Sequence, residues 1–109
     1  MPALDKRLKA REAVVELHGH RYTLRRPTAR QRIEAAGGTR LDLARACVVG
    51  WDLTGLDLLP GGDPTPAAFD RELWDDWLDD APDLWLPLID AVEDLIARHD
   101  AALEAAAKN

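Results

Sequence analysis

The stretch REAVVELHGHRYTLRRPT, residues 11–28, predicts a β-hairpin closed by a two-residue turn at His18-Gly19. The cross-strand pairs that this turn would create are Leu17 with His20, Val15 with Tyr22 and Ala13 with Leu24. Opposed residues share a face, so this register gathers apolar side chains on one side, with Val14 as the exception. Gly19 supplies the positive φ that such a turn requires. A lone two-stranded ribbon is marginal in water, so the hairpin should lie on helices or borrow a partner's strand.

Two helix starts follow the hairpin, each with the side chains of a capping box. The two pairs are Thr28 with Gln31 and Thr39 with Asp42. The first helix is expected to reach about Ala36 and to stop at Gly37-Gly38, and the second to close at Gly50. Apolar residues at helical spacing in the second are Leu41, Ala44, Cys47 and Val48. Residues 28–50 are therefore predicted to form two short helices.

The next segment, WDLTGLDLLPGGDPT, is predicted to be a loop over residues 51–65. Its prolines and glycines exclude regular structure across most of its length. It nevertheless carries large apolar side chains, namely Trp51, Leu53, Leu56, Leu58 and Leu59. A loop of this kind must be packed against the body of the protein or used for binding.

Residues 66–107 are predicted to form the C-terminal helices. Thr65-Pro66 has the form of an N-cap followed by proline at the first helical position. Residues 82–86 are expected to form a separate turn, and the long helix to begin near Pro87, because proline is not tolerated deep inside a helix. The apolar stripe of that helix comprises Leu88, Val92, Leu95, Ile96, His99 and Leu103.

Together these elements predict one mainly α domain, with a small N-terminal β-hairpin followed by about four helices packed as a compact bundle. A chain of 109 residues is long enough for one core and too short for two. The predicted segments within residues 1–109 are 1–12 as an arm or short helix, 13–26 as the hairpin, 28–50 as two short helices, 51–65 as a loop and 66–107 as the C-terminal helices.

Charge is divided unevenly along this chain, whose net charge is -6. Residues 1–50 carry 11 Lys and Arg against 5 Asp and Glu, whereas residues 51–109 carry 3 against 15. The two halves either neutralise each other in the fold or present two charged surfaces for binding. Nucleic acid is a poor partner because the acidic half repels phosphate. The charged N-terminus and the lack of a long apolar run predict neither a signal peptide nor a membrane span.

The sequence offers no constellation for catalysis, so we expect neither an enzyme nor a cofactor or metal. There is no serine, and Cys47, the single cysteine, falls on the inner face of a predicted helix. The pair His18 and His20 lies on a turn with no third ligand nearby in sequence. The aspartates of WDDWLDD, residues 74–80, indicate a solvated or protein-binding face, since the calcium-loop pattern around a glycine is absent.

Four tryptophans exceed what a core of this size readily encloses, so at least one is expected to be partly exposed. Exposed indoles anchor interfaces, and Trp51 and Trp85 are our first choices for that role. The candidate protein-binding residues are Trp51, Leu56, Leu58, Leu59, Trp74, Trp77, Trp85, Asp76 and Asp80.

The order of landmarks resembles the small tail assembly chaperones of tailed bacteriophages and phage-derived particles. The likeness covers roughly residues 13–97 and rests on the segments GHRYTLRRPTARQRIEA, VVGWDL, TPAAFDRELWDDW and PDLWLPLIDAVEDL. In that family a Y-x-L-R-x-P-T segment precedes a helix, and W-D-L leads through a variable loop into T-x-x-x-F/L. Here the loop after Trp51 is longer and richer in leucine than is usual.

This resemblance implies a non-enzymatic helper, in the cytoplasm of the bacterial host, that binds the tape measure protein and often the tail tube protein before polymerisation. An acidic rim with embedded indoles would suit an apolar helical client, and the hairpin edge could pair with a strand of a tube subunit. Two alternatives stay open: a structural virion component, such as a connector or tail-completion protein, and an acidic adaptor or inhibitor of a host protein. Contact between the basic half of one copy and the acidic half of another would give a homo-oligomer.

Overall fold

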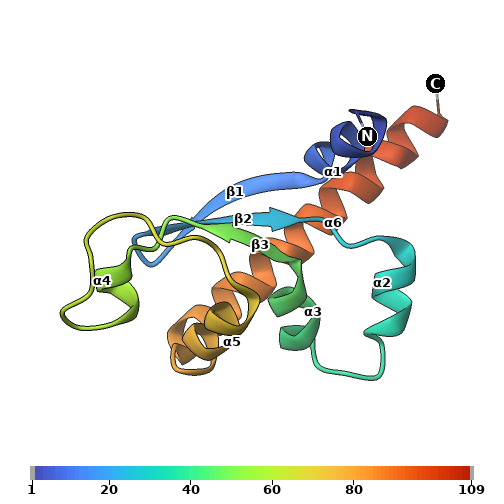
Figure 1. The fold of residues 1–109 in the computed structure, drawn as a ribbon. Helices are drawn as coiled ribbons and strands as arrows, with labels where there is room; N and C mark the ends of the chain where they lie inside the picture. Colours follow the sequence, from blue (N-terminus) through green and yellow to red (C-terminus); the bar gives the residue numbers. More distant parts are fainter. Residues whose placement is uncertain (1, 109) are drawn as a thin grey trace.

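The computed structural model describes residues 2–108, in which three strands form an antiparallel sheet and most of the helices lie on one of its sides (Figure 1). The elements in chain order are α1 (Pro2–Ala10), β1 (Glu12–Leu17), β2 (His20–Arg25), α2 (Ala29–Glu34), α3 (Arg40–Cys47), β3 (Val48–Trp51), α4 (Gly55–Leu58), α5 (Arg71–Asp79), the 3₁₀ helix η1 (Pro82–Leu84) and α6 (Trp85–Ala107). Helices account for 58% of the described residues, which confirms the mainly α class.

The hairpin of β1 and β2 is confirmed in the predicted register, with Leu17 opposite His20 at its closed end. His18 and Gly19 both have positive φ, 50° and 82°, as the two-residue hairpin turn requires. On the face turned to the helices Tyr22 is buried, whereas Val14 on the opposite face is 65% exposed. The alternation of the strands thus sorts the side chains as expected.

A third strand, β3, corrects the prediction that residues 48–50 end a helix and that Trp51 begins a loop. It pairs with β2, and this places Trp51 opposite Tyr22 and Val48 opposite Leu24. The run VVGW is too short for its periodicity to separate a strand from a helix, although β-branched valines favour a strand. Gly50 leaves room for Thr23 across the ladder, because a Cβ there would lie 3.1 Å from the Thr23 hydroxyl oxygen.

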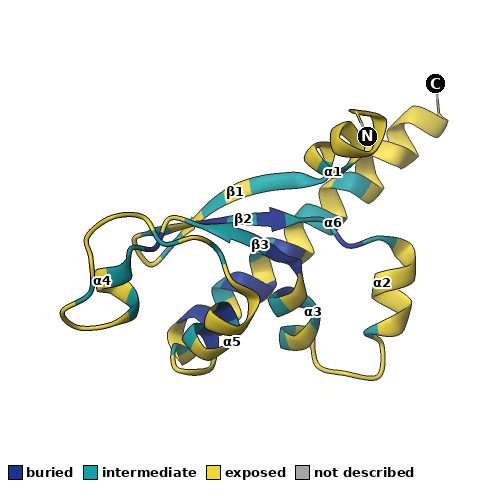
Figure 2. Cartoon of the chain, viewed as in Figure 1, coloured by how far each residue is buried: buried dark blue, intermediate teal, exposed yellow. Residues whose placement is uncertain are grey.

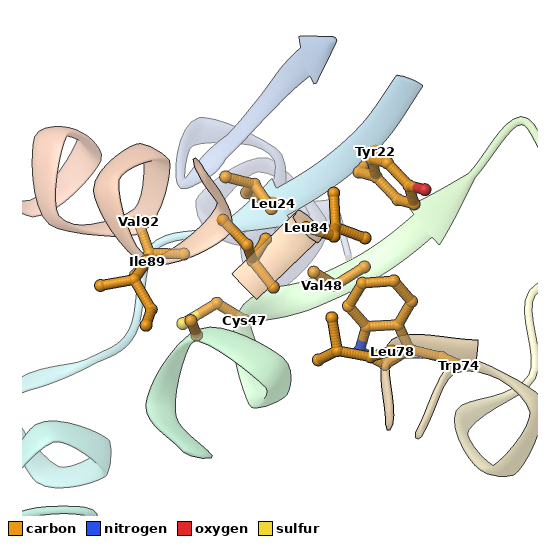
Figure 3. Packing of buried hydrophobic residues seen from close by; sticks show 11 residues of the cluster. Tyr22, Leu24, Cys47, Val48, Trp74, Leu78, Leu84, Ile89 and Val92 are labelled. Carbon is orange, nitrogen blue, oxygen red and sulfur yellow. The ribbon is translucent and has the colours of Figure 1, made fainter. Parts of the chain in front are cut away.

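The hydrophobic core lies where the sheet meets α3, α5 and the first turns of α6 (Figures 2 and 3). Its buried members are Tyr22, Leu24, Ala44, Cys47, Val48, Trp74, Leu78, Leu84, Leu88, Ile89 and Val92. The predicted stripe of α6 is only partly in this core. Leu88 and Val92 are buried, whereas Leu103 is exposed, because α6 continues past the end of the sheet (Figure 1).

The compact bundle that the sequence predicts is not confirmed. Neither α1 nor α2 contributes a buried residue. The Cα radius of gyration is 15.4 Å, with extents of 55 × 33 × 23 Å, against about 13 Å for a compact chain of this length. Figure 1 shows the cause: α1 and the end of α6 extend past one end of the sheet, and the loop with α4 extends past the other.

The predicted helix start at Thr65-Pro66 is wrong, although it satisfies the local rule. Pro66 instead forms a β-bridge with Thr54, and the N–H of Ala67 donates to the oxygen of Leu53 at 2.9 Å. This pairing holds residues 65–67 extended, so α5 begins only at Arg71. Asp70 is its N-cap. The predicted break after α5 is confirmed, since η1 fills it and α6 begins two residues before Pro87.

Candidate protein-binding surface

The loop between β3 and α5 is ordered around the short helix α4, where the sequence predicted no regular structure. The Thr54 hydroxyl accepts from the N–H of Asp57 at 3.2 Å, and the Asp57 carboxylate accepts from the N–H of Thr54 at 2.8 Å. This is a capping box, and its spacing T-x-x-D is the cue in the sequence that reveals α4.

The same loop presents leucines on a fixed backbone. The N–H of Leu56 donates to the oxygen of Asp63 at 2.8 Å, which closes the loop on itself, and Leu53 is completely buried at its base. By contrast, Leu56 and Leu59 are 51% and 66% exposed, whereas Leu58 is partly buried. Of the predicted binding leucines, Leu56 and Leu59 therefore offer the larger apolar surface to another molecule.

The tryptophans are mostly structural. Trp74 is completely buried, so its prediction as a partner-binding residue is wrong. Partial exposure of Trp51, Trp77 and Trp85 confirms that not all four indoles are enclosed. The indole N–H groups of Trp51, Trp74 and Trp85 donate to the main-chain oxygens of Ala67, Arg45 and Leu78 at 2.8, 2.9 and 2.7 Å. These bonds tie separate segments together, so Trp51 and Trp85 also act in the fold, and their role as interface anchors stays a prediction.

Trp77 differs because it lines an open pocket. Its indole N–H donates to the Tyr22 hydroxyl at 3.3 Å, and the His20 ring lies edge-on at a centroid distance of 6.1 Å. Burial raises the pKa of the Tyr22 hydroxyl, the bond from Trp77 opposes that rise, and the carboxylates of Asp52 and Asp57 add to it. The hairpin tip and the end of α5 therefore adjoin one another.

Carboxylates on α5 fall into two groups. Asp75 and Asp79 face Arg45 of α3, whose guanidinium nitrogens lie 3.7 and 2.7 Å from their oxygens. Asp76 and Asp80 are exposed and, in residues 2–108, have no ion-pair or hydrogen-bond partner for their carboxylates. The second group leaves uncompensated negative charge beside Trp77.

The two oppositely charged halves of the sequence partly neutralise each other in the fold. Arg32, Arg40 and Arg45 of the first half pair with carboxylates of the second half, namely Asp100, Glu93, Asp75 and Asp79. Residues 46–70 have no such compensation, because they contain four aspartates and no Lys or Arg. The acidic surplus is therefore concentrated on the α4 loop and the outer side of α5.

A larger cavity, of about 500 Å³, lies between α2, α3 and β3. Its apolar wall includes Leu43, Cys47 and Val49, and its charged wall includes both Arg71 and Asp42. Cys47 is buried as predicted, and burial raises the pKa of its thiol to about 11, so the thiol stays protonated at neutral pH. Nothing in the local sequence indicates this cavity, because α2 and α3 bring its walls together.

Three comparisons, with models of protein families, with curated proteins and with solved structures, find no match to this chain. Within residues 2–108 no helix combines the length and apolarity needed to cross a bilayer. The same residues contain no group of three or more His, Cys, Asp or Glu side chains placed to hold a metal ion. The candidate binding surface is therefore made of the exposed leucines of the α4 loop, Leu56 and Leu59, and the unpaired carboxylates of Asp76 and Asp80.

Proposed function

We propose that this chain is a non-enzymatic assembly chaperone that binds a phage-type tape measure protein, tail tube protein or both before tail polymerisation. The observation that carries the proposal is the exposure of Leu56 and Leu59 on an ordered loop without Lys or Arg. The resemblance of the sequence landmarks to tail assembly chaperones supports the same assignment.

The α4 loop offers what an apolar helical client needs. Because Leu53 and the capping box fix the backbone, little conformational entropy is lost when Leu56 and Leu59 receive a partner. A client helix could lay its apolar face over these leucines. The carboxylates of Asp57 and Asp63 keep the free loop hydrated and attract basic residues that flank the client's apolar stripe.

The test is co-expression of the chain with the tape measure protein and, separately, with the tail tube protein of the same genome. The wild-type chain should co-purify with at least one of them. The double variant Leu56→Ser/Leu59→Ser should reduce affinity by about tenfold or more, as loss of two interface leucines implies. The matched control Ile33→Ser/Leu103→Ser removes two exposed aliphatic side chains from α2 and α6 and should bind normally. Equal affinity of the two double variants would contradict the role of the loop.

The outer edge of β1 offers a second surface, which suits a strand of the tube protein. The pair that closes a two-residue turn is hydrogen-bonded, so alternation leaves the N–H groups of Glu12, Val14 and Glu16 pointing away from β2. The bond from the N–H of Arg26 to the oxygen of Arg11 fits this alternation. Such an edge can accept an added strand.

Val14→Pro tests the edge, because it removes one outward N–H without breaking a bond between β1 and β2. We expect it to weaken the complex with the tube protein and to leave the complex with the tape measure protein unchanged. Val14→Thr, which keeps the N–H, is the control. If Val14→Pro binds the tube protein as well as Val14→Thr does, the edge does not carry the interaction.

An assembly chaperone is absent from the finished particle, whereas a structural virion component remains in it, so the composition of the particle distinguishes the two functions. Mass spectrometry of purified particles should therefore detect the tape measure and tube proteins but not this chain. Stoichiometric retention of the chain would identify it as a virion part instead.

A further inference from the structure

A pocket of about 320 Å³ opens at the tip of the hairpin, beside the end of α5. Its walls come from two regions that are distant in sequence: the hairpin turn with the start of β2, and the segment from the end of α5 through η1. The lining residues are His18, His20, Tyr22, Trp77, Asp80, Ala81, Pro82, Asp83 and Leu84. Aromatic and aliphatic side chains thus form most of the wall, and two carboxylates complete it.

The carboxylates in this pocket have no counter-charge. Asp80 and Asp83 are exposed, and within the described part of the chain neither carboxylate is paired with a Lys, Arg or His or accepts a hydrogen bond. The other titratable groups that line the pocket are the imidazoles of His18 and His20 and the hydroxyl of Tyr22. Asp52, which lies 3.5 Å from the Nδ1 of His20, adds further negative charge nearby.

The geometry points to a site for the guanidinium group of an arginine side chain on the bound partner. The ring faces of aromatic residues attract cations, and guanidinium stacks on them more readily than ammonium does. The methylene groups of the arginine would contact Pro82 and Leu84, and its charge would meet Asp80 and Asp83. This inference rests on the proposed function in that it names a feature of the client: an arginine beside its apolar helical stripe.

The larger cavity at Cys47 differs from this pocket in the charges of its lining residues. Arg25, Arg71, Glu34 and Asp42 all line it, so it presents both signs of charge. It therefore has no electrostatic preference for a cation. Of these two cavities, only the pocket at Trp77 combines aromatic walls with carboxylates and has no Lys or Arg in its lining.

The pocket can be tested without the client. We would titrate the ¹⁵N-labelled chain with N-acetyl-arginine methylamide and follow the indole and backbone N–H signals by NMR. Saturable shifts should appear at the Trp77 indole N–H and in residues 80–84, and the buried Trp74 indole should not move. The same titration with the citrulline analogue, which is neutral and nearly isosteric, should give no saturable shift. Equal shifts with the two compounds, or none with arginine, would overturn the assignment.

Variants provide a second test that also uses the whole chain. Asp80→Asn/Asp83→Asn should weaken arginine binding by about fivefold or more, since each exposed charge contact contributes a small factor. Asp5→Asn/Asp90→Asn makes the same change in net charge on α1 and α6 and should bind arginine like the wild type. Equal weakening by both double variants would show attraction by net charge alone and would overturn a specific pocket.

Failure of the arginine-site assignment can be distinguished from failure of the proposed chaperone function. If the chain binds its client but Asp80→Asn/Asp83→Asn has no effect on either ligand, the pocket assignment fails and the chaperone proposal stands. If arginine binds as predicted but neither tail protein does, the pocket stands and the proposed client is wrong.

Discussion

Two tryptophans three residues apart on α5 have opposite surroundings. Trp74 is sealed between the sheet and α3, and its N–H donates to the oxygen of Arg45. Trp77 lies about 60° further around the helix axis, where it borders the open pocket at the hairpin tip. One short helix therefore supplies a core residue on one side and a candidate binding residue on the other.

The aspartates at α5 also fall into two groups, one paired with an arginine and one unpaired. Asp75 and Asp79 pair with Arg45 on the side that faces α3, whereas Asp76 and Asp80 remain unpaired, and Asp80 lines the pocket of Trp77. A cluster that reads in sequence as one acidic run is thus two groups with different tasks. The inner group joins α5 to α3, and the outer group gives the surface its charge.

The largest expected effect is on the inner tryptophan. Trp74→Ala should lower the free energy of unfolding by about 3–5 kcal/mol, as for other buried aromatic residues, and this could unfold a domain of this size. Trp77→Ala should cost clearly less, because part of its indole already contacts water. Urea denaturation followed by circular dichroism measures both. A larger loss for Trp77→Ala than for Trp74→Ala would reverse the comparison.

The stability of the hydrophobic core should also depend on alkaline pH, through Cys47. Burial raises the pKa of its thiol from 9.0 to about 11, so the folded state holds the proton more tightly than the unfolded state. The contribution of the protonated thiol to the free energy of unfolding is complete below the pKa of the unfolded state. It is lost as pH rises through the pKa of the folded state, and the loss is about 3 kcal/mol for a difference of two pKa units. Unfolding free energies at pH 8 and pH 11 should therefore differ less in Cys47→Ala than in the wild type. An equal difference would exclude this origin.

The ion pairs of Arg45 should contribute less. Arg45→Met should lower the free energy of unfolding by up to about 1 kcal/mol, the usual range for partly exposed pairs. Asp80→Asn, on the outer side, should change it by less than about 0.5 kcal/mol. Chemical denaturation at low and high salt compares them, and only the Arg45→Met effect should shrink with salt. If Asp80→Asn destabilises as much as Arg45→Met, the two groups of aspartates are not distinct.

The smallest effect should be local to the α4 loop. Thr54→Ala removes the cap from α4 and should cost about 1 kcal/mol or less. Hydrogen exchange should become faster at residues 55–59 and remain unchanged in β2. Unchanged exchange in the loop would show that the bonds to Asp63 and Thr65, not the cap, keep it ordered.

Local signals made part of this fold predictable. The alternation around His18-Gly19 fixed the hairpin register, and the boxes at Thr28 and Thr39 marked two helix starts correctly. Each depends on residues within one turn or one hairpin. The same kind of signal, at Thr54, would also have revealed α4.

The remaining features depend on distant segments. Val48 becomes a strand residue because β2 has a free edge beside it, and Pro66 is held extended by its bridge with Thr54. Helical spacing separates Trp74 from Trp77 but does not show which of them is buried. The pocket at Trp77 requires η1 and the hairpin turn to meet, which no local pattern indicates.

Hydrogen exchange of the chain alone and in its complex with the co-expressed tape measure protein tests whether the α4 loop and the Trp77 pocket bind the client. We predict slower exchange in the complex at residues 55–59 and 76–83, with little change in α2. Failure to form a complex with either tail protein, or protection that spares both of those segments, would show that these two regions do not bind it.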